Sequence, residues 1–219
     1  MKTATVRRVS APVPLTGETA DTVWARADRT RIDNFLWTEP DRQPQAVVRL
    51  LYDETAIYLQ YTVEDRHIHA TTDSLNGPVW EDSCVEFFAT PASISRERYF
   101  NFEINCTGTF HFGYGSDRNG RTLVDRDAAA DVRATSSVDG RTKQPHPTDS
   151  SWWVAVELPF TVISTLTGTA VTPTTGTRWH GNFHRLGRRP EPFYAAWNPV
   201  ETPEPDFHHP SAFGAIRFE

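Results

Sequence analysis

The fold of this chain is decided by the stretch Asn76-Gly77-Pro78-Val79-Trp80-Glu81-Asp82-Ser83-Cys84-Val85-Glu86-Phe87-Phe88. Its first three residues are a turn signal, and Trp80 then stands where a loop meets a strand. From residue 83 onward the side chains alternate with a period of two, which predicts a β-strand over residues 83–90. Within that strand Glu86 is a carboxylate in a run otherwise suited to burial. Burying it costs stability unless a polar cavity or a partner receives it.

An aromatic ring beside an inward-pointing acid is a pattern typical of sugar sites. The ring of Trp80 can cover the apolar C–H face of a pyranose, and the Glu86 carboxylate can accept hydrogen bonds from its hydroxyl groups. The stretch therefore predicts a carbohydrate-binding surface around these two residues.

A second strand, over residues 99–114, is predicted as the long partner of the first. One of its faces is apolar and belongs to the core: Phe100, Phe102, Ile104 and Cys106. The other face is unusually polar: Tyr99, Asn101, Glu103 and Asn105. If the two strands pair antiparallel, Glu86 and Glu103 face the same side. Cys84 then lies on the polar side and Cys106 on the core side, so we expect no disulfide bond between them.

The remaining alternating segments predict an all-β protein. Strands are expected at residues 46–52, 56–63, 132–135, 152–160, 178–185, 193–197 and 215–218, with short helical segments at 128–130 and 162–166. About ten strands with few helices indicate a single-domain β-sandwich over residues 1–219. The first 45 residues show little periodicity. We expect an irregular segment there, with one helical turn, whose Trp24, Phe35 and Trp37 plug one end of the sandwich rather than bind a ligand.

Composition excludes several classes of function. The net charge of −6 argues against nucleic-acid binding, which needs a basic face. No run of about 18 apolar residues predicts a membrane span. The N-terminal residues lack the apolar segment of a signal peptide, so we expect a cytoplasmic protein unless a leader has been removed. His67 and His69 have a spacing that can hold a metal, but no third ligand is evident, and surface histidines are favoured.

Several blocks of the sequence match one family in order. They are Val48–Glu54, Pro78–Phe88, Tyr99–Asn105, Val156–Phe160, Trp179–Phe183, Ala196–Trp197 and Phe207–Gly214. On these blocks the chain resembles the family 9 carbohydrate-binding modules, especially freestanding family-9-like bacterial proteins. The resemblance implies a jelly-roll-like, DOMON-like β-sandwich that is monomeric and holds the reducing end of a glucan or xylan chain.

The resemblance also implies roles for individual residues. Trp80 matches the first of two aromatic residues that clamp a terminal sugar, Phe207 stands where the second is usually a Trp, and Glu86 matches the acid between them. The family's arginine on the neighbouring strand is replaced by Glu103, and an Asn before the second clamp by Glu204, which implies a site with two acids and no arginine. The carbohydrate-binding residues expected are Trp80, Glu86, Asn101, Glu103, Asn105 and Phe207. No cofactor is required; family members bind structural calcium, for which Asp53, Asp65 and Asp82 are candidate ligands.

Other functions remain as alternatives to noncatalytic binding. Glu86 and Glu103 on adjacent strands could stand about 5–5.5 Å apart, the separation of a retaining glycoside hydrolase, but no further acid/base set is visible. Haem held between a Met and a His is disfavoured because Met1 is the only methionine. A serine hydrolase is disfavoured because no Gly-x-Ser-x-Gly motif occurs. An interaction module whose ligand is not a sugar is the last alternative.

Overall fold

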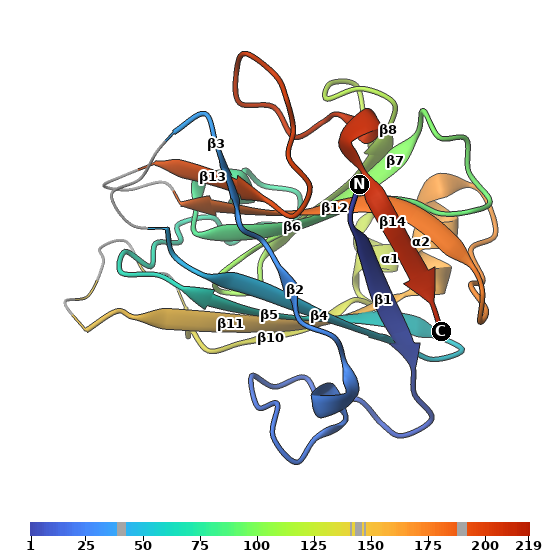
Figure 1. Ribbon diagram of the computed structural model, residues 1–219, viewed down its shortest axis with the longest axis horizontal. Helices are drawn as coiled ribbons and strands as arrows, with labels where there is room; N and C mark the ends of the chain where they lie inside the picture. Colours follow the sequence, from blue (N-terminus) through green and yellow to red (C-terminus); the bar gives the residue numbers. More distant parts are fainter. Residues whose placement is uncertain (39–42, 141, 143–145, 147, 188–191) are drawn as a thin grey trace.

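Two layers of β-strands face each other in the computed structural model, which describes residues 1–38, 43–140, 142, 146, 148–187 and 192–219 (Figure 1). The strands are β1 (Thr3–Arg8), β2 (Thr30–Arg31), β3 (Asn34–Leu36), β4 (Ala46–Tyr52), β5 (Ala56–Glu64), β6 (Cys84–Thr90), β7 (Tyr99–Asn105), β8 (Phe110–Gly115), β9 (Thr122–Leu123), β10 (Arg133–Ser136), β11 (Ser151–Pro159), β12 (Arg178–Gly187), β13 (Phe193–Ala196) and β14 (Gly214–Phe218). Short helices are η1 (Val23–Arg26), η2 (Val79–Glu81), η3 (Pro210–Ala212), α1 (Arg126–Ala129) and α2 (Phe160–Thr167). The predicted all-β sandwich is confirmed.

The strands form one continuous order that curls on itself, β10-β11-β5-β4-β1-β14-β12-β6-β7-β8-β9. β1 joins the two layers because it pairs in parallel with β14 through residues 3–6 and with β4 through residues 7 and 8. As for the short strands β2 and β3, the expectation that the N-terminal segment is irregular is wrong for β1. Its local signal is weak, since only Ala4 and Val6 are buried, and its pairing depends on partners far away in the sequence.

The expected long strand over residues 99–114 is also wrong, because it is a hairpin of β7 and β8. The chain reverses at residues 106–109, where Gly108 has a φ of 88°, a conformation that glycine adopts without strain. The side chain of Asn105 accepts hydrogen bonds from the backbone N–H groups of Thr107 and Thr109 at 3.2 and 3.0 Å. An Asn that bonds the backbone two residues further on favours a turn over a continuing strand.

The main core lies between the two layers. Val85, Phe87, Phe100 and Phe102 fill it from β6 and β7, and Leu59 and Tyr61 on β5 are among the residues that meet them from the opposite layer. Full burial of each such side chain stabilises the fold by about 1.5–3 kcal/mol. The alternate residues of β6 and β7 point to the outer face of their layer. There a second cluster of Phe88, Tyr99, Leu186, Phe207 and Phe213 forms under the loops.

Cys84 and Cys106 are both free and buried. Cys106 lies in the main core, whereas Cys84 lies in the cluster on the outer face, so the predicted absence of a disulfide bond is confirmed with its reason. No helix in the described part of the chain combines the length and apolar character needed to cross a membrane.

Candidate functional site

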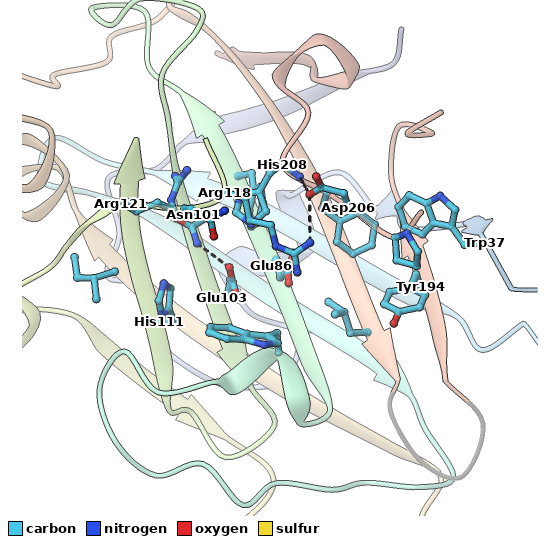
Figure 2. Close-up of a pocket in the computed structure, with 18 residues that line it drawn as sticks. Trp37, Glu86, Asn101, Glu103, His111, Arg118, Arg121, Tyr194, Asp206 and His208 are labelled. Carbon is cyan, nitrogen blue, oxygen red and sulfur yellow. Dashed lines mark hydrogen bonds and ion pairs between the residues drawn. The ribbon is translucent and has the colours of Figure 1, made fainter. Parts of the chain in front are cut away.

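A cavity of about 540 Å³ opens on the outer face of the layer that contains β12, β6, β7 and β8 (Figure 2). This volume lies within the range of about 300–1,000 Å³ usual for small-molecule sites. The lining residues are Trp37, Trp80, Glu86, Phe88, Asn101, Glu103, His111, Arg118, Asn119, Gly120, Arg121, Leu123, Leu186, Tyr194, Pro205, Asp206, Phe207 and His208.

One row of side chains runs beneath the cavity across four strands. His184 on β12 lies opposite Glu86 on β6, which lies opposite Glu103 on β7, which lies opposite His111 on β8. Each end of the row carries an aromatic ring. Phe207 stacks on His184 at 4.0 Å with an interplanar angle of 9°, and Trp80 meets His111 edge-on at 5.3 Å. The arrangement places two carboxylates between two aromatic residues.

The two glutamates of the row are almost fully buried, with exposed fractions of 3% for Glu86 and 4% for Glu103. The Asn101 side chain donates a hydrogen bond of 2.7 Å to Glu103. Burial, and after it the charge of the adjacent Glu86, raises the pKa of Glu103 well above its ordinary value. Glu103 therefore keeps a proton at pH values where an exposed glutamate has lost it. A protonated carboxyl can donate as well as accept hydrogen bonds.

His184 supports Glu86 from the neighbouring strand. Its Nδ1 lies 3.0 Å from Glu86 Oε2, and burial lowers the pKa of the fully enclosed imidazole to about 3. We therefore interpret the contact as a neutral imidazole that donates its Nδ1 proton to the carboxylate. Such a donor holds the carboxylate in place without adding a positive charge.

Arg121 contributes a cation that the resemblance did not predict. It lies just before β9, and its Nε donates a hydrogen bond of 2.7 Å to Asn101 Oδ1, while its guanidinium covers the Tyr99 ring at 4.4 Å. Arg118 lines the same cavity and lies 4.0 Å from Asp206. The expectation of a site with two acids and no arginine is therefore wrong, because a loop between β8 and β9 supplies what the neighbouring strand lacks.

A glycine makes room for this contact. Gly113 on β8 stands opposite Asn101, and a Cβ at this position would lie 2.8 Å from Asn101 Oδ1 and 3.3 Å from Arg121 Nε. A larger residue would have to push both groups away. Arg121 thus orients Asn101 by a hydrogen bond, and Gly113 leaves the space that Asn101 occupies.

The turn that begins the opening stretch positions Trp80. Asn76 has a φ of 60°, and its side chain accepts a hydrogen bond from Phe112 N at 3.0 Å and donates one to Val124 O at 2.9 Å. Its carbonyl oxygen lies 3.1 Å from Nδ1 of His111. These contacts fix the loop against β8, so the ring of Trp80 on η2 rests on His111 at one wall of the cavity.

The opposite wall is aromatic as well. Figure 2 shows Trp37 and Tyr194 at one end of the cavity and His111 and Arg121 at the other, with Glu86 and Glu103 between them. The segment before β14 is anchored to β7 by a contact of 2.8 Å between the Tyr99 hydroxyl and His208 Nδ1. Burial lowers the pKa of His208 to about 3 and raises the pKa of Tyr99 to about 12.

Five of the six residues predicted to bind carbohydrate line the cavity: Trp80, Glu86, Asn101, Glu103 and Phe207. The sixth, Asn105, does not. It is fully buried, donates hydrogen bonds to Thr72 O at 3.0 Å and to Asp82 Oδ2 at 2.9 Å, and closes the β7–β8 turn. The structure therefore places Asn105 in the framework. Glu204 is exposed and outside the lining, whereas Asp206 takes part in it.

Three aromatic residues of the N-terminal segment and one histidine of β12 stood out in the sequence but were not predicted to belong to the site. Trp37, expected to plug one end of the sandwich, packs against the outer-face cluster and also lines the cavity. Trp24 is buried in a separate cluster beside η1, and Phe35 packs against the main core. His184 belongs to the polar alternates of β12, and this pattern could have pointed to a functional face.

Each of the three candidate calcium ligands has a hydrogen-bond or ion-pair partner within the protein. Asp53 accepts hydrogen bonds from the Thr55 and Ala56 backbone at 2.7 and 2.9 Å. Asp65 pairs with Arg185, and Asp82 accepts from the Thr71 backbone at 2.9 Å. Among the residues that the structure describes, no group of three or more His, Cys, Asp or Glu side chains could hold a metal ion.

Comparisons with known proteins also indicate a carbohydrate-binding protein. The sequence model of carbohydrate-binding family 9 matches residues 20–218. The chain is similar in structure to a Bacteroides uniformis ATCC 8492 protein for which carbohydrate binding has been proposed, with a TM-score of 0.84, 27% identity, and coverage of 100% of this chain and 99% of that one. No curated protein sequence matches the chain significantly.

Two further solved structures share the fold at lower identity. Both are family 9 modules from Caldicellulosiruptor kristjanssonii, one in complex with cellotriose and one in complex with glucose. Each has a TM-score of 0.64 and covers 100% of this chain. The identities are 15% and 16%, and the match covers 94% and 96% of those chains, respectively.

Proposed function

The chain belongs to carbohydrate-binding family 9, and from this premise we propose that it binds the terminal, reducing-end sugar of a glucan or xylan oligosaccharide without cleaving it. One observation carries the proposal. The row His184–Glu86–Glu103–His111 brings two buried carboxylates under the cavity, and an aromatic side chain covers each end of the row.

The chemistry of the cavity suits a pyranose. The part-exposed ring of Trp80 offers an apolar face to the C–H groups of the sugar, a contact that contributes about 0.5–1.5 kcal/mol by analogy with aromatic pairs. Glu86 accepts hydrogen bonds from hydroxyl groups, and protonated Glu103 both donates and accepts them. Hydrogen bonds to charged groups contribute about 1.5–3 kcal/mol each. Arg118 and Arg121 add donors at the rim.

The loops around the cavity favour a chain end over a chain interior. Arg118 before β9 and Asp206 before β14 lie 4.0 Å apart, and the Tyr99–His208 contact ties the segment before β14 to the start of β7. An oligosaccharide that passed straight through the cavity would need an open exit on this side. A terminal sugar needs only one way in.

Titration calorimetry with cellobiose, cellotriose and xylobiose tests the proposal against the same sugars reduced to alditols. We expect wild-type protein to bind the reducing forms and to lose most of the affinity when the end ring is opened. Trp80→Ala should abolish most binding. Trp153→Ala, which removes a Trp packed on Gly17 in the other layer, is the matched control and should bind like wild type.

The outcomes separate the alternatives. Equal affinity for the oligosaccharides and for their alditols would contradict recognition of the reducing end. Binding to the interior of a sugar chain would then be the remaining alternative. No binding of any saccharide by folded protein would overturn the proposed function.

A glycoside hydrolase is the second candidate because two carboxylates with different environments lie side by side. Release of new reducing ends from cello- or xylo-oligosaccharides, lost in Glu103→Gln, would support it. We expect none, because Glu86 and Glu103 lie beside each other beneath the cavity rather than on either side of a bound glycosidic bond.

A further inference from the structure

We infer that Trp37 forms a second sugar subsite, next to the one above Glu86 and Glu103, and that Phe207 is a positioning residue between them. The inference rests on the proposed function and adds to it a preference for disaccharides and longer chains over single sugars. It gives Trp37 the stacking role that the family resemblance implies for Phe207.

Phe207 is too enclosed to offer a ring face. Only 7% of its surface is exposed. One face stacks on His184 at 4.0 Å, and the rings of Trp37 and Tyr194 approach it at 5.4 and 6.2 Å. Stacking on a pyranose needs most of one aromatic face to be open. Phe207 therefore holds His184 and Trp37 in place, and through His184 it supports Glu86.

Trp37 lines the cavity beside Phe207, with the two ring centroids 5.4 Å apart. It follows β3, whose Leu36 pairs with Tyr194 on β13, and it is only half-buried and lines the cavity. In Figure 2 it lies at the end far from His111, with Glu86 and Glu103 in between. A sugar above the two glutamates would thus have Trp80 at one side, and the next sugar of the chain would reach Trp37 at the other.

The orientation of the Trp37 ring is fixed before any ligand binds. Its indole N–H donates a hydrogen bond of 2.7 Å to Thr202 O, and Tyr194 packs edge-on against it at 5.7 Å with an interplanar angle of 80°. A ring whose orientation is already set loses little conformational freedom when it stacks on a ligand.

The backbone at Trp37 is strained. Its φ of 60° lies in the left-handed region, which is unfavourable for a residue with a bulky side chain. Strained residues persist where the surrounding structure holds them, and they gather at ligand-binding sites. The hydrogen bond to Thr202 and the packing on Tyr194 are the contacts that hold this one.

The test compares affinities for glucose and for cellotriose, measured by titration calorimetry on the full chain. In wild type we expect cellotriose to bind more tightly than glucose. Trp37→Ala should weaken cellotriose binding about tenfold, the upper range for one aromatic contact, and leave glucose binding unchanged. Trp37→Phe keeps a smaller ring and should recover part of the loss. It also serves as the folded variant if Trp37→Ala loses stability.

Phe207→Leu is the matched variant on the same wall. Leu keeps the apolar volume that supports His184 and Trp37 and removes only the ring as a stacking surface, so we expect the ratio of the cellotriose and glucose affinities to stay as in wild type. A drop of that ratio in Phe207→Leu, with Trp37→Ala unchanged, would overturn the inference. Equal losses for both sugars in Trp37→Ala would overturn it too. If wild type binds neither these two sugars nor xylobiose, the proposed function itself fails, which is a distinguishable result.

Discussion

Glu86 on β6 and Glu103 on β7 stand directly opposite each other, and both carboxyl groups are more than nine-tenths buried. Like charges opposite each other on one face of a sheet destabilise it. The protein lessens that cost by keeping a proton on Glu103, whose pKa is raised by burial and by Glu86. A bound sugar hydroxyl would meet one acceptor and one group that can also donate.

The first prediction concerns the pH dependence of stability through Glu103. Because its pKa is raised in the folded state, the unfolded chain loses this proton first, and stability falls as the pH rises above about 4.5. Glu103→Gln removes that loss. We therefore expect the difference in unfolding free energy between the variant and wild type, measured in urea at pH 5 to 8, to grow in favour of the variant. The growth is up to about 1.4 kcal/mol per pH unit until the folded-state pKa of Glu103 is reached.

Exposed Glu97 before β7 provides the control for that experiment. Glu97→Gln should follow the wild-type curve at each pH. Parallel curves for wild type and Glu103→Gln would show that Glu103 ionises in the folded protein as it does in the unfolded chain.

The second prediction concerns acid sensitivity through His184. Its folded-state pKa of about 3 lies below the unfolded value of about 6.5, so the unfolded chain binds a proton first as the pH falls. Stability is present above pH 6.5 and is lost below it, by about 2 kcal/mol at pH 5 from this residue alone. His184→Asn, which retains a donor near the Nδ1 position, should lessen the slope of unfolding free energy between pH 6.5 and 4.

His146 is the control because it is exposed. His146→Asn should leave the slope as it is in wild type. An unchanged slope in His184→Asn would mean that the imidazole is charged in the folded protein and forms an ion pair with Glu86.

The third prediction uses two glycines of β8. Gly113→Ala would place a Cβ 2.8 Å from Asn101 Oδ1, so it should displace Asn101 from Arg121 and Glu103 and weaken cellotriose binding several-fold. Gly115→Ala meets its nearest atom, Cγ of Arg121, at 3.5 Å, which is an ordinary contact, and it should bind like wild type. Titration calorimetry measures the binding of both variants, and their melting temperatures show whether both are folded. Equal binding by the two would remove Asn101 from the site.

The fourth prediction concerns the two thiols. Burial raises the pKa of Cys106 to about 12 and raises that of Cys84 well above its ordinary value, so neither is a reactive thiolate at neutral pH. An aromatic disulfide reagent should find almost no thiol in the native protein and two per chain in denaturant without reductant. Finding none in the denatured monomer would contradict the packing of both residues.

Much of the fold could be predicted because it depends on local patterns. The β4–β5 hairpin, the core strand β6, the late strand β11 and the helix α2 each occur where alternation or composition indicated them. The prediction failed where the decisive interaction is not a pattern of burial. The β7–β8 turn depends on the side-chain bonds of Asn105, and β1 depends on pairing with distant β14 and β4.

The candidate site was predictable to the same degree. Alternate residues of a strand point to the same face of the sheet. Glu86, Asn101 and Glu103 therefore share a face, which explains why they meet. Asn105 shares that face but lies one step further, under the turn, where Asp82 and Thr72 receive its amide. The alternation of side chains along a strand indicates the face of the sheet on which each one lies. It does not indicate whether a cavity or a loop covers it.

The sequence by itself determined which side of each strand is polar, because neighbouring side chains of an extended chain must point to opposite faces. Only the tertiary structure decided the row His184–Glu86–Glu103–His111, since strand register is set by pairing between segments as much as 98 residues apart. It also decided that Arg121 meets Asn101 and that Trp37 meets Phe207. Arg121, Trp37 and Phe207 lie on loops, and the direction of a loop depends on the packed elements that hold its two ends.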